Sequence, residues 1–212
     1  MGELTECDAK GIKAALFLQT IKKSTADLHV LLESNPLLLA ITMPGITLHQ
    51  YYCYLILMKK IAAVYEKVIP PRLTGIFSGG EQRKASQLIA EDVECIRHVP
   101  PQTFVLKDYT LPIEQMTIPF ALGFMYVMEG SKLGGKVIFK HIQRSLGFSE
   151  NRGAKYLADY GVNSIALWKE FLSKFSGYVA ENDCEAEAIE GARYAFKSIH
   201  DFFDSNRTVY EI

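Results

Sequence analysis

The sequence lacks any apolar run long enough to cross a membrane. Its longest runs, such as Ala14–Leu18 and Leu37–Ile41, fall far short of the roughly 20 residues that a helical span requires. It also lacks the marks of a secretory leader, because Glu3 and Glu6 stand where such a leader carries Lys or Arg, and no small-residue cleavage site follows. We therefore expect a soluble, cytoplasmic protein without membrane association.

An excess of charge of either sign is missing as well. The chain has 23 basic and 24 acidic residues, so its formal net charge of −1 provides no field that would attract nucleic acid. Cysteine is scarce and scattered, since the four cysteines are far apart and form no C-x-x-C pair. This spacing argues against a zinc site or a disulfide framework and indicates reduced thiols.

Strict apolar alternation is also absent, and apolar residues instead recur at spacings of three and four through most of the chain. This pattern predicts an all-α protein. A length of 212 residues without a visible linker predicts one domain over 1–212, with residues 1–11 flexible. The expected helices cover about 12–34, 37–43, 48–69, 81–98, 118–146, 164–179 and 184–203.

Several helix boundaries have local signals. Asn35-Pro36 predicts the end of the first helix, because the residue before a proline disfavours the helical region. Thr47 and Gln50 form a capping box for the next long helix, which we expect to end before Pro70-Pro71. Gly147 is a C-terminal stop, and Asp183 is the expected N-cap of the last helix.

Glycines interrupt the helical segment 118–146 without ending its periodicity. Gly130, Gly134 and Gly135 fall within six residues, and each costs about 1 kcal/mol relative to alanine inside a helix. Gly123, Gly130 and Gly134 share one face, where a flat group could press against the backbone or the helix could kink. Close helix packing would use the same residues. A phosphate loop is disfavoured, because no strand precedes the glycines and no G-K-[ST] follows them.

His29 lies on a mostly apolar face of the first helix, near Leu18 and Thr25. A neutral imidazole there could bind a haem iron, and Glu33, one turn later, could accept the other ring N–H. Lys22 is seven residues earlier on the same face, about 10.5 Å away, a distance suited to a propionate. The alternative is that His29 is an ordinary hydrogen-bonded core residue.

Three segments resemble bacterial haem oxygenases, especially the bacteriophytochrome-associated and pseudomonad-type subgroup. The segment 126–140, Y-V-M-E-G-S-K-L-G-G-K-V-I-F-K, is similar to the distal helix of that subgroup, in which E-G-S-x-L-G is the fitting pattern. The segment 24–33, S-T-A-D-L-H-V-L-L-E, resembles the proximal helix with its axial histidine. Trp168-Lys-Glu-Phe171 continues the similarity towards the C-terminus.

The resemblance implies a role for each candidate residue. His29 would be the iron ligand with Glu33 beside it, and the distal glycines Gly130, Gly134 and Gly135 would let the helix lie against haem. Ser131 stands where mammalian-type relatives have Asp, and we hypothesise that its hydroxyl and ordered water donate to bound oxygen. The candidates for propionate contacts are Lys22, Lys132 and Lys169.

The implied fold is a single-domain helical bundle that holds haem between a proximal helix and a glycine-kinked distal helix. The implied activity is oxidative cleavage of haem to biliverdin, carbon monoxide and ferrous iron. Haem would be both cofactor and substrate. The implied partners are an external electron donor, either ferredoxin or a flavoprotein reductase, and a bilin-accepting phytochrome.

Other functions stay open on the sequence alone. A haem-binding carrier or sensor without turnover would use the same histidine and slot. A thiaminase-like hydrolase needs an activated cysteine, and a di-iron carboxylate oxidase needs paired E-x-x-H elements. Neither feature lies in the motif regions.

Overall fold

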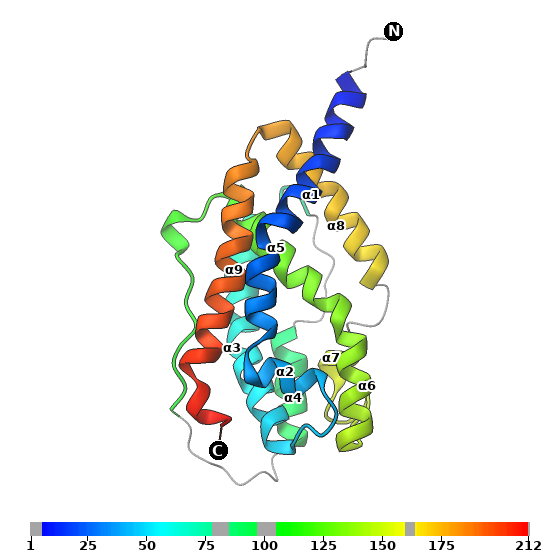
Figure 1. Cartoon of the computed structure of the whole chain (residues 1–212), viewed down its shortest axis with the longest axis vertical. Coiled ribbons are helices and arrows are strands. Elements are labelled where there is room, and N and C mark those ends of the chain that lie inside the picture. The colour runs from blue at the N-terminus through cyan, green and yellow to red at the C-terminus, as the bar shows by residue number, and fades with distance from the viewer. Residues whose placement is uncertain (1–5, 78–84, 97–104, 160–163, 212) are drawn as a thin grey trace.

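The computed structural model describes residues 6–77, 85–96, 105–159 and 164–211, and in these ranges the chain is helical without a named strand (Figure 1). The predicted all-α class is confirmed. The α-helices are α1 Glu6–Glu33, α2 Pro36–Thr42, α3 Leu48–Arg72, α4 Ala85–Cys95, α5 Ile118–Ser131, α6 Gly135–Leu146, α7 Lys155–Asp159, α8 Ser164–Asn182 and α9 Glu185–Ser205. Short 3₁₀ turns are η1 Ile113–Gln115, η2 Lys132–Gly134 and η3 Arg207–Val209.

The end of α1 follows the proline signal. The helix stops at Glu33, and Asn35 caps α2 by accepting from the Leu37 N–H at 3.0 Å, with Pro36 in the first turn. Asn35 is buried and its amide also donates to the Tyr210 hydroxyl at 3.1 Å. The end of the chain therefore secures the junction between α1 and α2. Of the stretch 1–11, expected to be flexible, residues 6–11 belong to α1 and residues 1–5 lie outside the described residues.

The start of α3 confirms the capping box, since Thr47 and Gln50 satisfy each other's backbone donors. Its predicted end was wrong, because α3 continues through Pro70 and Pro71 to Arg72. Both prolines stand in the last turn, where the helix has few further hydrogen bonds to lose and the Leu73 N–H already bonds back to the Pro70 carbonyl. The predicted helix 81–98 is observed as α4, and its outer residues 81–84 and 97–98 lie outside the described residues.

The core of the bundle is the pairing of α5 with α9, and α1 packs across α9 and α8 (Figure 1). The backbones of α5 and α9 approach closely because each helix turns a glycine towards the other, Gly123 on α5 and Gly191 on α9. A Cβ on Gly123 would overlap the Ala188 carbonyl oxygen, and one on Gly191 would overlap the Phe120 carbonyl oxygen. At Gly123 the packing interpretation of the glycine face is therefore the right one.

The long helix predicted over 118–146 is divided in two. Thr117 caps α5 with Pro119 in the first turn, η2 replaces one α-helical turn, and α6 continues to Leu146. Gly147 adopts a left-handed conformation with φ of 71°, so the predicted C-terminal stop is confirmed. The glycine-rich turn thus forms a kink through a 3₁₀ segment rather than through a bend in continuous α-helix.

The C-terminal half contains one unpredicted helix and one misplaced cap. The short α7 follows a turn that pattern reasoning left unassigned, and the carboxylate of buried Asp92 accepts from the N–H groups of Lys155 and Tyr156 at its start. The predicted cap Asp183 instead has a left-handed φ of 53°, and Cys184 precedes α9 without a side-chain cap. In the part of the chain that is described, no helix is long and apolar enough to cross a membrane.

Candidate functional site

His29 lies on the side of α1 that α9 covers incompletely, and its side chain is 55% exposed. Its Nδ1 lies 3.3 Å from Glu33 Oε2, one helical turn away. An ionised carboxylate can only accept, so a neutral ring beside it is favoured in the form that carries its proton on Nδ1 and its lone pair on Nε2. No described residue occupies Nε2, and in the neutral ring with its proton on Nδ1 this nitrogen would be able to bind a metal.

The ring of His29 is held from the side by α9. Phe196 is buried and contacts the imidazole edge-on, with ring centroids 5.4 Å apart and planes at 70°. Arg193, one turn earlier on α9, donates to the Ser24 carbonyl and the Asp27 carboxylate, and so fixes the turn of α1 before the histidine. The sequence contains no signal for these contacts, because more than 160 residues separate their partners.

The three glycines of the predicted face have three different environments. Gly123 is buried against α9, as described above. A Cβ on Gly130 would lie 3.4 Å from the Trp168 ring, an ordinary contact, whereas a Cβ on Gly134 would meet nothing within 4 Å. The backbone at Gly134 is therefore the open part of the face, and Gly135 behind it is buried as the first residue of α6.

Ser131 is exposed at the end of α5. Its hydroxyl donates to the Met128 carbonyl at 2.8 Å, which directs the proton back into the helix. Its oxygen remains able to accept, and donation to a ligand would require rotation about χ1. The hydroxyl proton that we assigned to oxygen binding is thus engaged within the helix in this structure.

The three lysines that we predicted to contact haem propionates differ in the residues that they now pair with. Lys132 pairs with both carboxylate oxygens of Glu129 at 2.7 and 2.8 Å, and Glu129 also accepts from the Tyr65 hydroxyl at 3.5 Å. Burial, followed by the negative charge of Glu129, raises the pKa of Tyr65 well above its ordinary value, so the phenol stays protonated as a donor. Lys22 and Lys169 are exposed and form no ion pair with any residue in the described ranges.

Helix α8 connects the two sides of this arrangement. It packs against α1 on one side and against α5 and η2 on the other. Trp168 of α8 lies over Gly130, stacks on Phe171 at 5.5 Å and contacts Tyr126 at 5.4 Å. The sequence resemblance included Trp168 but did not identify it as a site residue. Its status as the single tryptophan was the available signal.

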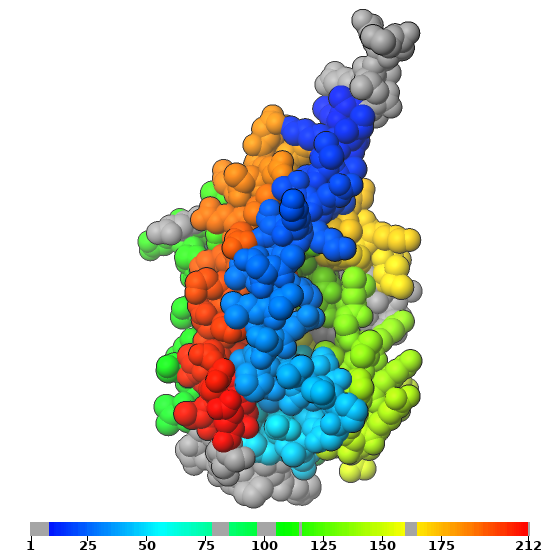
Figure 2. Space-filling view, in the orientation of Figure 1, coloured from blue at the N-terminus to red at the C-terminus, as the bar shows by residue number. Residues whose placement is uncertain are grey.

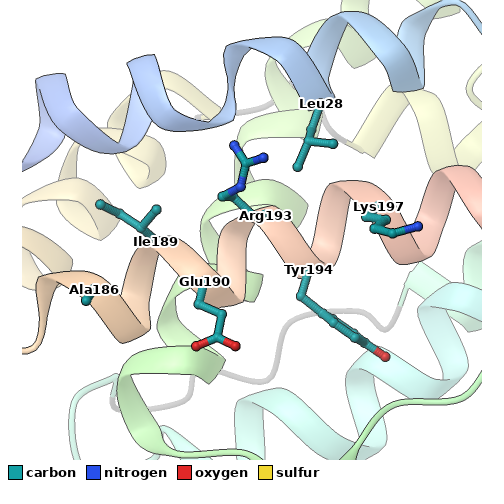
Figure 3. Close-up of a pocket in the computed structure, with 7 residues that line it drawn as sticks. All are labelled: Leu28, Ala186, Ile189, Glu190, Arg193, Tyr194 and Lys197. Carbon is teal, nitrogen blue, oxygen red and sulfur yellow. The ribbon is translucent and has the colours of Figure 1, made fainter.

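The hollow drawn in Figure 3 is a different feature. It is an open groove of about 480 Å³ between α1 and α9, lined by Leu28, Ala186, Ile189, Glu190, Arg193, Tyr194 and Lys197. In that view Arg193 turns towards α1, whereas Glu190 and Tyr194 point away from it. None of the predicted site residues lines this groove. It is a depression between two packed helices and does not contain the candidate ligands.

The residues present fit a planar, iron-bearing, anionic group better than a metal cluster. They supply one accessible imidazole nitrogen, an open glycine backbone in the turn that α8 contacts, and two exposed lysines. Across the described ranges, no three His, Cys, Asp or Glu side chains are grouped to hold a metal ion. One imidazole nitrogen is enough to hold a porphyrin iron, whereas a bare metal ion needs several ligating side chains.

A family model and a curated relative both match part of this chain, and both are heme oxygenases. The family model described as heme oxygenase matches residues 112–205, which include the glycine turn and Lys169 but not His29. The chain is 29% identical to Heme oxygenase PigA of Pseudomonas aeruginosa over 132 residues, which is 62% of this chain and 64% of that relative. The match thus spans less than two thirds of the relative's length.

The fold has a solved counterpart over nearly the whole chain. The heme oxygenase from Neisseria meningitidis, solved in NO-bound and CO-bound forms, superposes with a TM-score of 0.68 at 24% identity. The superposition covers 89% of this chain and 92% of the other. Unlike the family model, it extends over most of the N-terminal half, so the all-α bundle is shared between the two proteins.

Proposed function

We propose that the chain is a haem oxygenase, which binds haem through His29 and cleaves it with dioxygen and external electrons to biliverdin, carbon monoxide and ferrous iron. The match of the heme oxygenase family model to residues 112–205 and the shared all-α fold support this proposal. The observation that carries this proposal is the exposed His29 imidazole, whose Nδ1 lies 3.3 Å from Glu33 Oε2 and whose Nε2 has no protein partner in the described part of the chain. A carrier or sensor without turnover would need the same nitrogen. The experiment below therefore measures binding and product separately.

When bound, haem supplies the iron that activates dioxygen and the ring carbon that is oxidised. The protein's residues would hold the ring and exclude competing ligands. The Glu33 carboxylate, 3.3 Å from Nδ1, would increase the basicity of Nε2 by accepting from Nδ1. The edge-on contact with Phe196 limits the rotation of the imidazole on the side that faces α9.

The distal side would be supplied by the turn that joins α5 to α6. Gly134 leaves its backbone open, and a flat ligand could approach it without meeting a side chain. Lys22 and Lys169 could pair with carboxylates of the ligand without first breaking an ion pair, whereas Lys132 would have to exchange Glu129 for a propionate. We therefore rank Lys132 below the other two as a propionate contact.

Turnover would also require an external electron donor, for which ferredoxin and a flavoprotein reductase are the candidates, and the bilin would suit a phytochrome acceptor. We keep the prediction of a reducing, cytoplasmic location. It is supported by Cys53, Cys95 and Cys184, which carry free thiols. Burial raises the pKa of Cys53 to about 12, so its thiol is unreactive at neutral pH.

The test is a hemin titration of the wild-type chain and of His29→Ala, with His200→Ala as the matched control. We expect one equivalent of hemin to give a histidine-ligated spectrum in the wild type and the control, and an altered spectrum in His29→Ala. Oxygen and a reductase are then added, and bilin and carbon monoxide are measured. A stable haem complex that yields neither product would indicate a carrier. An identical spectrum in His29→Ala would exclude this ligand.

A further inference from the structure

The segment after α9 turns back towards the first helix. Through the turn η3 it places Val209 and Tyr210 in the core, where both side chains are buried. The Val209 carbonyl lies 3.0 Å from His49 Nε2 on α3, and a carbonyl can only accept, so this nitrogen is the donor. In Figure 2 the red residues of this segment lie against the blue end of α1 at the lower front of the molecule. The last part of the bundle thus contacts the helix that carries His29.

The Tyr210 hydroxyl is bonded on two sides. It donates to the Phe203 carbonyl of α9 at 3.0 Å and accepts from Asn35 Nδ2 at 3.1 Å. Burial raises the pKa of Tyr210, so the phenol keeps the proton that it donates. Asn35 is only 2% exposed, and removing the hydroxyl would take from its buried amide the acceptor that the fold provides. The pair is therefore a fixed link between α9 and the junction of α1 with α2.

Asn35 divides its own hydrogen bonds between two helices. Its side-chain oxygen caps α2, and its backbone N–H donates to the Leu32 carbonyl of α1 at 3.1 Å. Beside it, the Ser34 N–H donates to the Val30 carbonyl at 3.0 Å. The terminal turn of a helix opens easily unless its end is tied to the rest of the fold. Tyr210 thus reaches the last turn of α1 through Asn35.

Glu33 is the last residue of α1, and the direction of its side chain depends on this turn. The side chain is 69% exposed, and across the described ranges its carboxylate pairs with His29 alone. The imidazole has a second support, because Phe196 of α9 contacts it from the side. The carboxylate has no such support. If the last turn of α1 opened, Glu33 would therefore leave Nδ1 while the ring stayed against α9.

We propose that Tyr210 is a positioning residue for His29, which acts through Asn35 to keep the Glu33 carboxylate beside Nδ1. This inference rests on the proposed function, because it concerns the nitrogen assigned to the iron. In a neutral ring without the carboxylate, the proton is free to leave Nδ1 for Nε2, where it would occupy the lone pair that binds a metal. Asn35 and Tyr210 are 175 positions apart, so no local motif indicates the link.

The test compares Tyr210→Phe with Tyr109→Phe in the haem-free chain. Tyr109 is the matched control, since it is also buried and its hydroxyl bonds to Ser198 of α9 at 3.0 Å rather than to the junction of α1 with α2. At about pH 8.5, where an ordinary histidine is neutral, nitrogen-15 NMR gives the share of His29 rings protonated on Nδ1. We expect this share to fall by about half or more, and amide exchange of Ser34 to rise about ten-fold, in Tyr210→Phe only.

A second variant tests the route through Asn35. Asn35→Ser keeps an oxygen that can cap α2 and removes the amide from which Tyr210 accepts. It should change the His29 ring as Tyr210→Phe does, and the double variant should add little to either single one. Fully additive changes would show that Tyr210 does not act through Asn35, and would overturn the inference.

Hemin provides a separate readout. Its transfer to an excess of apomyoglobin should be about three-fold faster or more from Tyr210→Phe than from the wild type or Tyr109→Phe. A chain that takes up no hemin would contradict the proposed function, whereas the NMR comparison in the haem-free chain would still test the link. An unchanged His29 ring and unchanged Ser34 exchange in Tyr210→Phe would overturn the inference. Equal changes in Tyr109→Phe would also overturn it, because they would indicate a general loss of stability.

Discussion

The two ends of one glycine face behave in opposite ways. At Gly123 the helix backbone is pressed against α9, and a single added carbon would overlap the Ala188 carbonyl oxygen. At Gly134, eleven residues later on the same segment, an added carbon would meet nothing. The same residue type therefore joins two helices at one end and leaves a backbone exposed at the other. Spacing alone cannot distinguish these roles.

The largest effect is expected at Gly123, the glycine that is packed against α9. We expect Gly123→Ala to lower the free energy of unfolding by about 3 kcal/mol or more, because the overlapping atom belongs to the backbone of α9 and cannot rotate away. Urea denaturation followed by far-UV circular dichroism measures the loss. Gly177→Ala is the matched control, since Gly177 lies within α8 and its added carbon would meet nothing within 4 Å. Equal stability of the two variants would contradict the close α5–α9 contact.

A large side chain at Gly134, the open glycine, should weaken hemin binding. We expect Gly134→Leu to weaken hemin binding about ten-fold, or about 1.4 kcal/mol, because the side chain would fill the space against which we place the ring. Optical titration measures the affinity, and unfolding of the ligand-free variant shows whether the fold is intact. If the leucine variant binds hemin as tightly as the wild type, the ring does not lie against Gly134.

A smaller substitution at the same position should change stability in the opposite direction from Gly123→Ala. Gly134 has φ of −74°, which alanine adopts readily, and the turn has room for a methyl group. We expect Gly134→Ala to raise the free energy of unfolding of the haem-free chain by up to about 1 kcal/mol, since it restricts the unfolded chain. A destabilised Gly134→Ala protein, assayed in the same urea series, would show that the turn is packed after all.

The smallest effect should come from the charge contact between α1 and the helix that packs on Gly123. The Arg193 guanidinium, through hydrogen bonding, holds the pKa of Asp27 below its ordinary value. A lowered pKa stabilises the fold at neutral pH, and the contribution is lost as the pH falls through the lowered value. Asp27→Asn should therefore reduce the urea midpoint slightly at pH 7, and the reduction should be smaller at about pH 3, below the ordinary aspartate value of about 3.9. A constant difference at both values would assign the effect to packing.

Local signals predicted most of the fold. The proline after Asn35, the capping box at Thr47 and the stop at Gly147 depend on residues close in sequence, and all three are observed. Errors arose where a local rule met tertiary context. Pro70 and Pro71 fit inside the last turn of α3. At the start of α9, Cys184 occupies the N-cap position predicted for Asp183, and the Asp183 carboxylate pairs with Lys13 instead.

The candidate site could be predicted only in part. Glu33 is one turn from His29, so their contact follows from helix geometry. Phe196 could not be found in this way, because its position depends on how α9 crosses α1. The ion pair between Lys132 and Glu129 is a local contact, yet the motif led us to assign the lysine to a ligand instead.

The packing of α1 also sets an order of events during synthesis. This helix leaves the ribosome before α9, which carries Phe196 and Arg193 and begins at Glu185. At the usual pace of translation, the interval between them is on the order of ten seconds. Throughout that time the nascent imidazole has neither Phe196 nor Arg193 beside it. With His29 as the proposed iron ligand, capture of the pigment would be postponed until α9 has been made, and a ribosome that stalls before α9 would release a fragment unable to orient this imidazole.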